Sequence, residues 1–143
     1  MTMPQTYFHA SLEFDAFIVD VRDTCVLQTH HQAYHTLRGV LHAFRKHLTI
    51  NDALAFADIL PAVTRAIFVE DWRPSSLPPP PFPDRATLAR EVKSNRRHHN
   101  LAPETAIENV AAALRRSSID ERELDRRLAT LPPGAVDFWT VNR

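Results

Sequence analysis

Glycine is almost missing from this chain, and its scarcity limits the folds that the chain can adopt. The 143 residues include two glycines, Gly39 and Gly134, where a chain of average composition would have about ten. Glycine supplies the positive φ angles of tight hairpin turns and allows the close backbone approach of phosphate-binding loops. The sequence therefore argues against a hairpin-rich β fold and against a glycine-rich nucleotide site.

A proline-rich segment divides the chain into two nearly equal parts. Residues 74–83 read Pro-Ser-Ser-Leu-Pro-Pro-Pro-Pro-Phe-Pro, and proline lacks the N–H that helices and central strands need. We expect this segment to be extended, as in polyproline II. It separates a first unit, 1–74, from a second unit, 84–143, with residues 75–83 as a stiff linker. The alternative is a docking site for a proline-recognising domain.

Apolar residues recur at helical spacing throughout the first unit. We predict a helix over 12–25, a second over 30–48 with a capping box that begins at Thr29, and a third after Thr49 that is interrupted at Pro61. The apolar positions that set these phases are Phe14, Phe17, Ile18, Val21, Leu37, Val40, Leu41, Phe44, Leu48, Phe56, Leu60, Val63 and Ile67.

The second unit repeats this plan. Asp84 is a candidate N-cap, Pro103 suits the first position of a helix, and Asp120 precedes Glu123 in the pattern of another helix start. The apolar positions of these helices are Leu88, Val92, Ala106, Val110, Leu114, Leu124, Leu128 and Leu131.

The two units align at a shift of 71 residues. This shift pairs Leu60-Pro61 with Leu131-Pro132, and it pairs Ile67-Phe68 with Phe138-Trp139. We therefore predict an all-α fold of two tandem pseudo-repeated helical units, with three to four helices each, packed as one helical bundle. Coincident amphipathic helices without a repeat are the alternative.

Charge and cysteine content narrow the function classes further. The formal net charge is zero, unlike the basic charge of a typical DNA-coating protein. Cys25 is the single cysteine, so no internal disulfide can form. No signal peptide and no apolar run of the roughly 20 residues needed to cross a bilayer is visible. We expect a cytoplasmic protein that does not enter a membrane.

A long stretch of the first unit carries a family resemblance. The run Ala33-Tyr-His-Thr-Leu-Arg-Gly-Val-Leu-His-Ala-Phe-Arg-Lys-His-Leu48, followed by Leu60-Pro61 and Ile67-Phe-Val-Glu-Asp-Trp72, resembles the bacterial and archaeal family called domain of unknown function 2267. The similarity continues through Leu131-Pro132 to Phe138-Trp139. The resemblance implies an all-helical fold of two tandem units, and it provides no established activity and no catalytic residues to transfer. One departure is Asp71, where the family commonly has glycine before the tryptophan.

Histidine is abundant, with eight residues, and three of them share one face of the helix over 30–48. His31, His35 and His42 lie within about 40° of each other, together with Arg38 and Arg45, and opposite the apolar arc. His31 and His35, at i and i+4, are spaced to hold one metal ion, whereas His42 is roughly 10 Å farther along the axis. The face is interpreted as a solvated surface, with a His31/His35 metal site or a pH-sensitive partner surface as alternatives.

Two further surfaces have both a structural and a functional interpretation. The basic run Arg90, Lys93, Arg96, Arg97, His98 and His99 could contact phosphates. However, it has no interleaved aromatic residues, and a solvated helix end favoured by the helix dipole explains it as well. Phe68, Trp72, Phe138 and Trp139 either pack between the units or form a dimer interface.

Motifs for enzyme chemistry are absent from the sequence. There is no G-x-S-x-G, P-loop, H-E-x-x-H or C-x-x-C motif, and Asp20 and Asp23 near Cys25 would raise the pKa of its thiol. We therefore assign no catalytic residue, cofactor or metal. The hypothesis is a non-enzymatic interaction or regulatory module that forms homo-oligomers or binds another protein, with His42, Arg38, Arg45, Trp72 and Trp139 as the candidate partner surface. The alternatives are nucleic-acid binding around residues 90–99, which we do not expect, and metal binding at His31/His35.

The predicted rotation of the second helix can be tested by two substitutions. Phe44→Ala removes a side chain from the apolar arc and should cost about 3–5 kcal/mol of unfolding free energy. His35→Ala on the opposite face should stay within about 0.5 kcal/mol. Urea denaturation measures both changes in unfolding free energy. Equal destabilisation by the two variants would show that the predicted orientation of the helix is wrong.

Overall fold

A computed structural model describes residues 3–95 and 102–142, and within these residues the secondary structure is helical, with no strand. This confirms the all-α prediction. The helices are α1 Gln5–Phe8, α2 Ala10–Thr24, α3 His30–Arg45, α4 Ile50–Ala57, α5 Ala62–Val69, α6 Arg85–Ser94, α7 Ala106–Arg116, α8 Glu121–Ala129 and α9 Ala135–Phe138.

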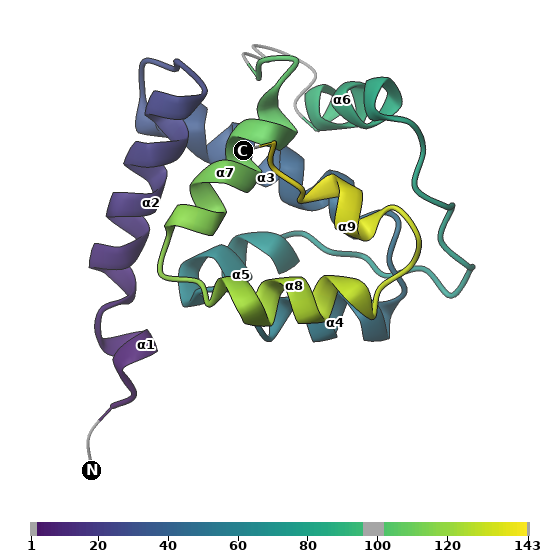
Figure 1. The fold of residues 1–143 in the computed structure, drawn as a ribbon, viewed down its shortest axis with the longest axis horizontal. Helices are drawn as coiled ribbons and strands as arrows, with labels where there is room; N and C mark the ends of the chain where they lie inside the picture. The colour runs from purple at the N-terminus through teal and green to yellow at the C-terminus, as the bar shows by residue number, and fades with distance from the viewer. Residues whose placement is uncertain (1–2, 96–101, 143) are drawn as a thin grey trace.

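Helix α3 is the central element of the fold. It packs against α2, α5, α6 and α7, while α8 packs against α4 and α9. Figure 1 shows α2 along one side of the molecule, with α1 projecting beyond the body at its end, and the proline-rich segment at the opposite side between α5 and α6. None of the helices α1 to α9 combines the length and the apolar character that a membrane span requires.

Side-chain caps mark where α3, α4, α6 and α8 begin. The Thr29 hydroxyl accepts a hydrogen bond from the backbone N–H of Gln32, and the Gln32 side-chain oxygen accepts one from the backbone N–H of Thr29. The predicted capping box is therefore confirmed. Asp84 and Asp120 cap α6 and α8 as predicted. Pro103 is not the first residue of a helix, because its carbonyl closes a turn with the N–H of Ala106, where α7 begins.

Two predicted helices are shorter than expected for reasons that the backbone makes clear. Helix α3 ends at Arg45 rather than at residue 48, because the chain tightens into i→i+3 bonds from His47 to Phe44 and from Leu48 to Arg45. The third predicted helix is broken before Pro61 into α4 and α5, as its missing N–H requires.

A cluster of aromatic rings centred on Phe44 forms the middle of the core. Ring centroids lie 4.7 Å from Phe44 at Phe56, 4.9 Å at Phe138, 5.4 Å at Phe82 and 5.5 Å at Trp139. These rings come from α3, α4, the proline-rich segment and the end of α9, so residues from both predicted units share one buried cluster.

Trp139 belongs to this core and not to a surface. Its side chain is fully buried and stacks on Phe56 at 5.7 Å. The prediction that Trp139 is part of a partner surface is therefore corrected, because a ring enclosed on all sides by apolar neighbours is inaccessible to a partner. The other interpretation of the terminal aromatics is core packing. It agrees with the structure for Phe68, Phe138 and Trp139, which are all buried.

Both glycines occupy positions where a β-carbon would not fit. At Gly39 on α3 a β-carbon would lie 2.8 Å from the carbonyl oxygen of Val92, so this glycine allows α3 and α6 to approach closely. Gly134 has a φ of +100°, and a β-carbon there would lie 2.5 Å from that of Phe82. The rare glycines thus fix the packing of α6 and of the proline-rich segment.

The position of Trp139 predicts that the chain unfolds as one cooperative unit. Trp139→Ala should cost about 3–5 kcal/mol because it empties a packed site, and it should destabilise the first unit as well, because Phe44 and Phe56 lose a neighbour. Val136→Ala, at a half-exposed neighbouring position, should change stability by less than about 0.5 kcal/mol.

Thermal denaturation can distinguish one cooperative unfolding unit from two independently unfolding domains. In Trp139→Ala the remaining tryptophan is Trp72, so fluorescence reports on the first unit while circular dichroism reports on all helices. Coincident transitions at a lowered Tm are expected. Two resolved transitions, or a first unit with unchanged Tm, would contradict the prediction.

Candidate functional site

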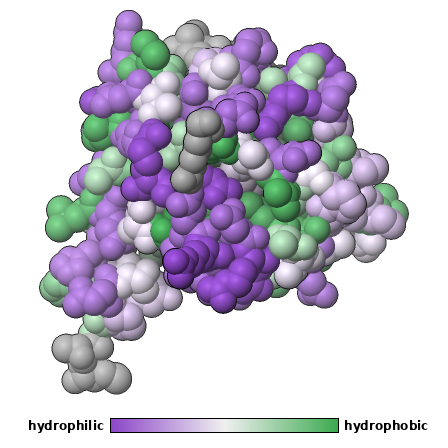
Figure 2. Space-filling model, viewed as in Figure 1, coloured by the Kyte–Doolittle hydropathy of each residue, from purple (hydrophilic) through white to green (hydrophobic). Residues whose placement is uncertain are grey.

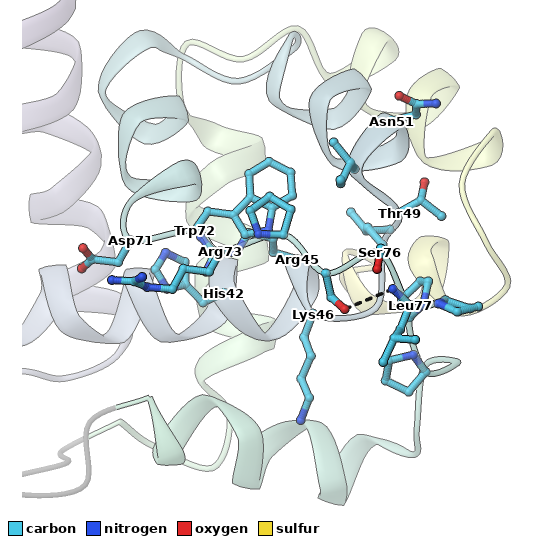
Figure 3. A pocket seen from close by; sticks show the side chains of 17 residues that line it. His42, Arg45, Lys46, Thr49, Asn51, Asp71, Trp72, Arg73, Ser76 and Leu77 are labelled. Atoms are coloured by element: carbon cyan, nitrogen blue, oxygen red, sulfur yellow. Dashed lines mark hydrogen bonds between the residues drawn. The ribbon is translucent and has the colours of Figure 1, made fainter.

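A groove lies between the C-terminal end of α3, the first residues of α4 and the proline-rich segment. It has a volume of about 1080 Å³, just above the range of about 300–1000 Å³ typical of ligand sites. Figure 3 shows its lining side chains from close by. The residues that line it are His42, Arg45, Lys46, Leu48, Thr49, Ile50, Asn51 and residues 71–80.

Arg45 holds the wall of the groove in place. Its guanidinium donates to the carbonyl oxygens of Phe68 and Glu70, at 2.9 and 3.0 Å, where α5 ends. Cationic side chains are favourable there because the last carbonyls of a helix have no intrahelical partner. The same guanidinium lies 5.7 Å from the centroid of the Trp72 ring, a cation–π distance. Arg45 therefore fixes the half-buried Trp72 beside the groove, as seen in Figure 3.

A polar network behind the groove fixes the turn that leads to Trp72. Arg38 donates to Glu70 at 3.1 Å, to Asp71 at 3.0 Å and to Asn95 at 2.8 Å. The Tyr34 hydroxyl also donates to Glu70. This bond and that from Arg38 lower the pKa of the Glu70 carboxyl, whereas burial and the neighbouring Glu70 raise the pKa of Tyr34 to about 12. Glu70 is thus held as a carboxylate.

Asp71 has the backbone conformation for which glycine is preferred. Its φ is +53°, in the left-handed region that aspartate tolerates better than most residues. Its carboxylate is held by Arg38. Asp71 therefore keeps a turn that glycine would adopt without strain, and it adds an ion pair.

The proline-rich segment is anchored at its far end by His47, a buried side chain that the sequence did not single out. Its Nδ1 lies 2.9 Å from the carbonyl oxygen of Pro80, and its Nε2 lies 2.8 Å from the Glu91 carboxylate on α6. Phe82 packs on His47 and on Phe44. These contacts fix the end of the segment against α3, and the groove lies between α3 and the rest of the segment.

The rim of the groove combines cations with apolar side chains. Arg73 is exposed, and Lys46, with 58% of its side chain exposed, lies 3.4 Å from Glu91. Leu77 is 74% exposed and Ile50 is 43% exposed. The sequence analysis did not identify Lys46, Arg73 or Leu77 as groove residues. Leu77 was the one detectable signal, because a single leucine among prolines could have indicated an exposed apolar contact.

The predicted candidate surface is only partly accessible. Trp72 and Arg45 line the groove, and Arg38 lies behind it. His42 is 8% exposed, with Nε2 donating to the carbonyl of Ile67 at 2.9 Å and Nδ1 accepting from Asn95 at 3.4 Å. The interpretation of His42 as part of a solvated stripe is therefore corrected. This face of α3 is exposed at its N-terminal end, at His31, and is covered by α5 and α6 at its C-terminal end, at His42.

The other predicted sites remain incomplete. The rings of His31 and His35 lie 4.5 Å apart, but no group of three or more His, Cys, Asp or Glu residues in 3–95 and 102–142 is arranged to hold a metal ion. In the basic run, Lys93 pairs with Glu104 and Arg90 donates to Thr87. Its members Arg96, Arg97, His98 and His99 lie outside the described residues.

Cys25 is a buried thiol. Burial raises its pKa to about 11, against a smaller opposing effect of a hydrogen bond from Asn109. The direction agrees with the sequence analysis, but burial is the cause, and Asp20 is instead held by Arg116 of α7, whose hydrogen bond lowers the pKa of Asp20.

The environment of His42 predicts acid sensitivity. Burial, with smaller contributions from Arg45 and Arg38, lowers the pKa of His42 from 6.5 to about 4, against the opposing hydrogen bond to Ile67. The unfolded chain therefore binds this proton more tightly than the folded chain does. The stability that His42 contributes is complete above about pH 6.5 and is lost as the pH falls towards 4, by up to about 3 kcal/mol.

Urea denaturation between pH 7 and 4 measures this dependence. His42→Gln should flatten the decline, because glutamine can donate to Ile67 without titrating. The matched variant His31→Gln, at an exposed position of the same helix, should keep the slope of the wild type. An unchanged slope in His42→Gln would assign the acid sensitivity to other groups.

Comparison with known proteins places the chain in a family without assigning it an activity. No curated protein matches it. Residues 14–138 match the model of a family described as "Uncharacterized conserved protein (DUF2267)". This range includes α3, both walls of the groove and α9. The chain belongs to the DUF2267 family.

Proposed function

We propose that this protein is a non-enzymatic interaction module that binds a partner segment in the groove. The segment combines large apolar side chains with carboxylates. The observation that carries this proposal is the lining of the groove, in which Leu77 and Ile50 are exposed and Arg73 and Lys46 supply positive charge.

The apolar character of the groove supports a protein ligand. Leu77 presents most of its surface to solvent at one wall, and Trp72 is half-buried at the other. Tryptophan next to a fixed arginine is typical of the residues that dominate binding energy at interfaces. Apolar surface left open beside a concave site is also typical of a contact surface rather than of an ordinary exterior.

The charges of the groove favour an acidic ligand. Three cations line it, Arg45, Lys46 and Arg73, against one carboxylate, that of Asp71, within the residues the structure describes. Asp71 is already paired with Arg38 and Lys46 with Glu91, so the exposed Arg73 provides the main attraction for an incoming carboxylate. Opposite charge at the rim mainly speeds association and selects the partner.

The engagement of the polar groups supports a non-enzymatic role. Arg45 binds backbone carbonyls, Arg38 binds carboxylates, and His42 donates to a buried carbonyl. These bonds fix the walls, whereas a general base needs a titrating group that can reach a substrate proton. We therefore propose recognition, with no chemical step.

We also propose that the two units are internal repeats with equivalent roles for their arginines. Arg45 on α3 donates to the carbonyl of Phe68, and Arg115 on α7 donates to that of Trp139 at 2.9 Å. These pairs lie at shifts of 70 and 71 residues, close to the shift that aligns the sequences. Of the two arginines, Arg45 stands beside an open groove with an aromatic wall, so we assign binding to the first unit.

Fluorescence anisotropy with a synthetic peptide tests the proposed binding. The probe is a labelled helical peptide with leucine and phenylalanine on one face and aspartates beside them. The control peptide has lysines in place of the aspartates. The wild type should prefer the acidic peptide, and Arg73→Glu should weaken its binding about tenfold, equivalent to about 1.4 kcal/mol.

Matched variants locate the binding. Leu77→Ser should also weaken the acidic peptide, whereas Arg90→Glu, an exposed charge reversal on α6, should leave its affinity unchanged. Equal losses in Arg73→Glu and Arg90→Glu would indicate attraction to overall charge. Absence of any effect from Arg73→Glu and Leu77→Ser would refute the groove as the binding site.

A further inference from the structure

The N-terminal arm, defined as residues 5–16, presents a large exposed apolar surface. None of the residues of α1 is buried, and the exposed fractions are 52% for Tyr7, 68% for Phe8 and 70% for Leu12. Figure 1 shows α1 projecting beyond the body. Figure 2 shows apolar side chains, in green, along the same edge over α1 and α2.

Three exposed residues of the arm share one helical face. Helical bonds continue through the junction of α1 and α2, since His9 donates to Gln5 and accepts from Glu13. Phe8, Leu12 and Asp15 are therefore at i, i+4 and i+7, on one side of a nearly continuous helix. Asp15 is exposed at the end of this stripe. The arm thus combines two large apolar side chains with a carboxylate at helical spacing.

The charge of the arm is opposite to that of the groove. Residues 5–16 contain the acids Glu13 and Asp15 and no lysine or arginine. The groove is lined by the exposed Arg73 and by Lys46, which is paired with Glu91. A membrane surface would instead select an arm with a cationic polar face. A positively charged protein groove with apolar walls is the chemistry that this arm fits.

The arm cannot enter the groove of its own molecule. In Figure 1 the arm lies at one side of the molecule and the proline-rich segment at the other, with α3 and α7 between them. Arm and groove are two different surfaces, so a contact between them joins two copies head to tail.

We infer that the N-terminal arm of one copy binds in the groove of a second copy, with Phe8 and Leu12 against Trp72 and Leu77 and with Asp15 beside Arg73. This inference rests on the proposed function, because it names the partner of the same groove. The association is heterologous: each copy offers one arm and one groove, and the weight-average mass rises with concentration. Salt weakens it because opposite charges meet at the rim.

Sedimentation velocity of the full chain at increasing concentrations tests the inference. The wild type should associate. Leu12→Glu, which disables the arm, and Arg73→Glu, which disables the groove, should each weaken association by at least about tenfold. Leu54→Glu is the matched control, because Leu54 is 51% exposed on α4 but belongs to neither surface. Circular dichroism of each variant verifies that it is folded.

Mixing the two disabled variants gives the sharpest result. The Leu12→Glu chain keeps its groove and the Arg73→Glu chain keeps its arm, so the mixture should form a one-to-one dimer and nothing larger. A monomeric wild type, unaffected association in Leu12→Glu, or a mixture that associates no better than its components would overturn the inference.

The acidic peptide separates this inference from the proposed function. If Leu12→Glu binds the peptide as the wild type does but no longer associates, both stand. If the peptide binds in the groove while association is absent or independent of the arm, the occupant is another protein and only the inference fails. If Arg73→Glu and Leu77→Ser bind the peptide like the wild type, the proposed function fails as well.

Discussion

The packing of Phe82 against Phe44 is the contact on which the groove depends. Phe44 lies at the centre of the core, where α3, α4 and the end of α9 meet. Phe82 is the one aromatic residue of the proline-rich segment, and its ring lies 5.4 Å from that of Phe44. Because proline lacks an N–H and restricts φ, the rest of the segment crosses the surface without forming a helix. His47 then fixes the direction of the segment through Pro80.

The sequence predicted the elements well where local physics decides them. The capping box at Thr29, the caps Asp84 and Asp120, and the break at Pro61 follow from hydrogen-bonding capacities within a few residues. Burial of Phe44 followed from the helical period. The same period could not separate His42 from His31, which share a face. Only the approach of α5 and α6 to one end of α3 buries the first and leaves the second exposed.

The candidate site was accessible to sequence reasoning only in part. Arg45 stood out on the histidine face of the helix over 30–48, Trp72 stood out as a large apolar residue near the end of the first unit, and both line the groove. Lys46, Arg73 and Leu77 did not, because their common location depends on the long-range contacts of His47 and Phe82. Trp139 has the same residue type and a similar place in its unit as Trp72, yet it is enclosed by the core. Residue type alone could not distinguish the two.

A proline-rich wall gives the groove a physical advantage for binding. Ordering a flexible loop on a ligand would subtract conformational entropy from the affinity. Here proline restricts φ before any ligand binds. One end of the segment is held by the contacts of Pro80 with His47 and of Phe82 with Phe44. The other end is held by Arg45 and by the left-handed turn at Asp71, which Arg38 stabilises. The exposed middle, with Leu77 and its neighbouring prolines, therefore presents apolar surface from a backbone that is fixed at both ends. When a partner segment binds there, most of the conformational entropy that is lost is that of the partner segment.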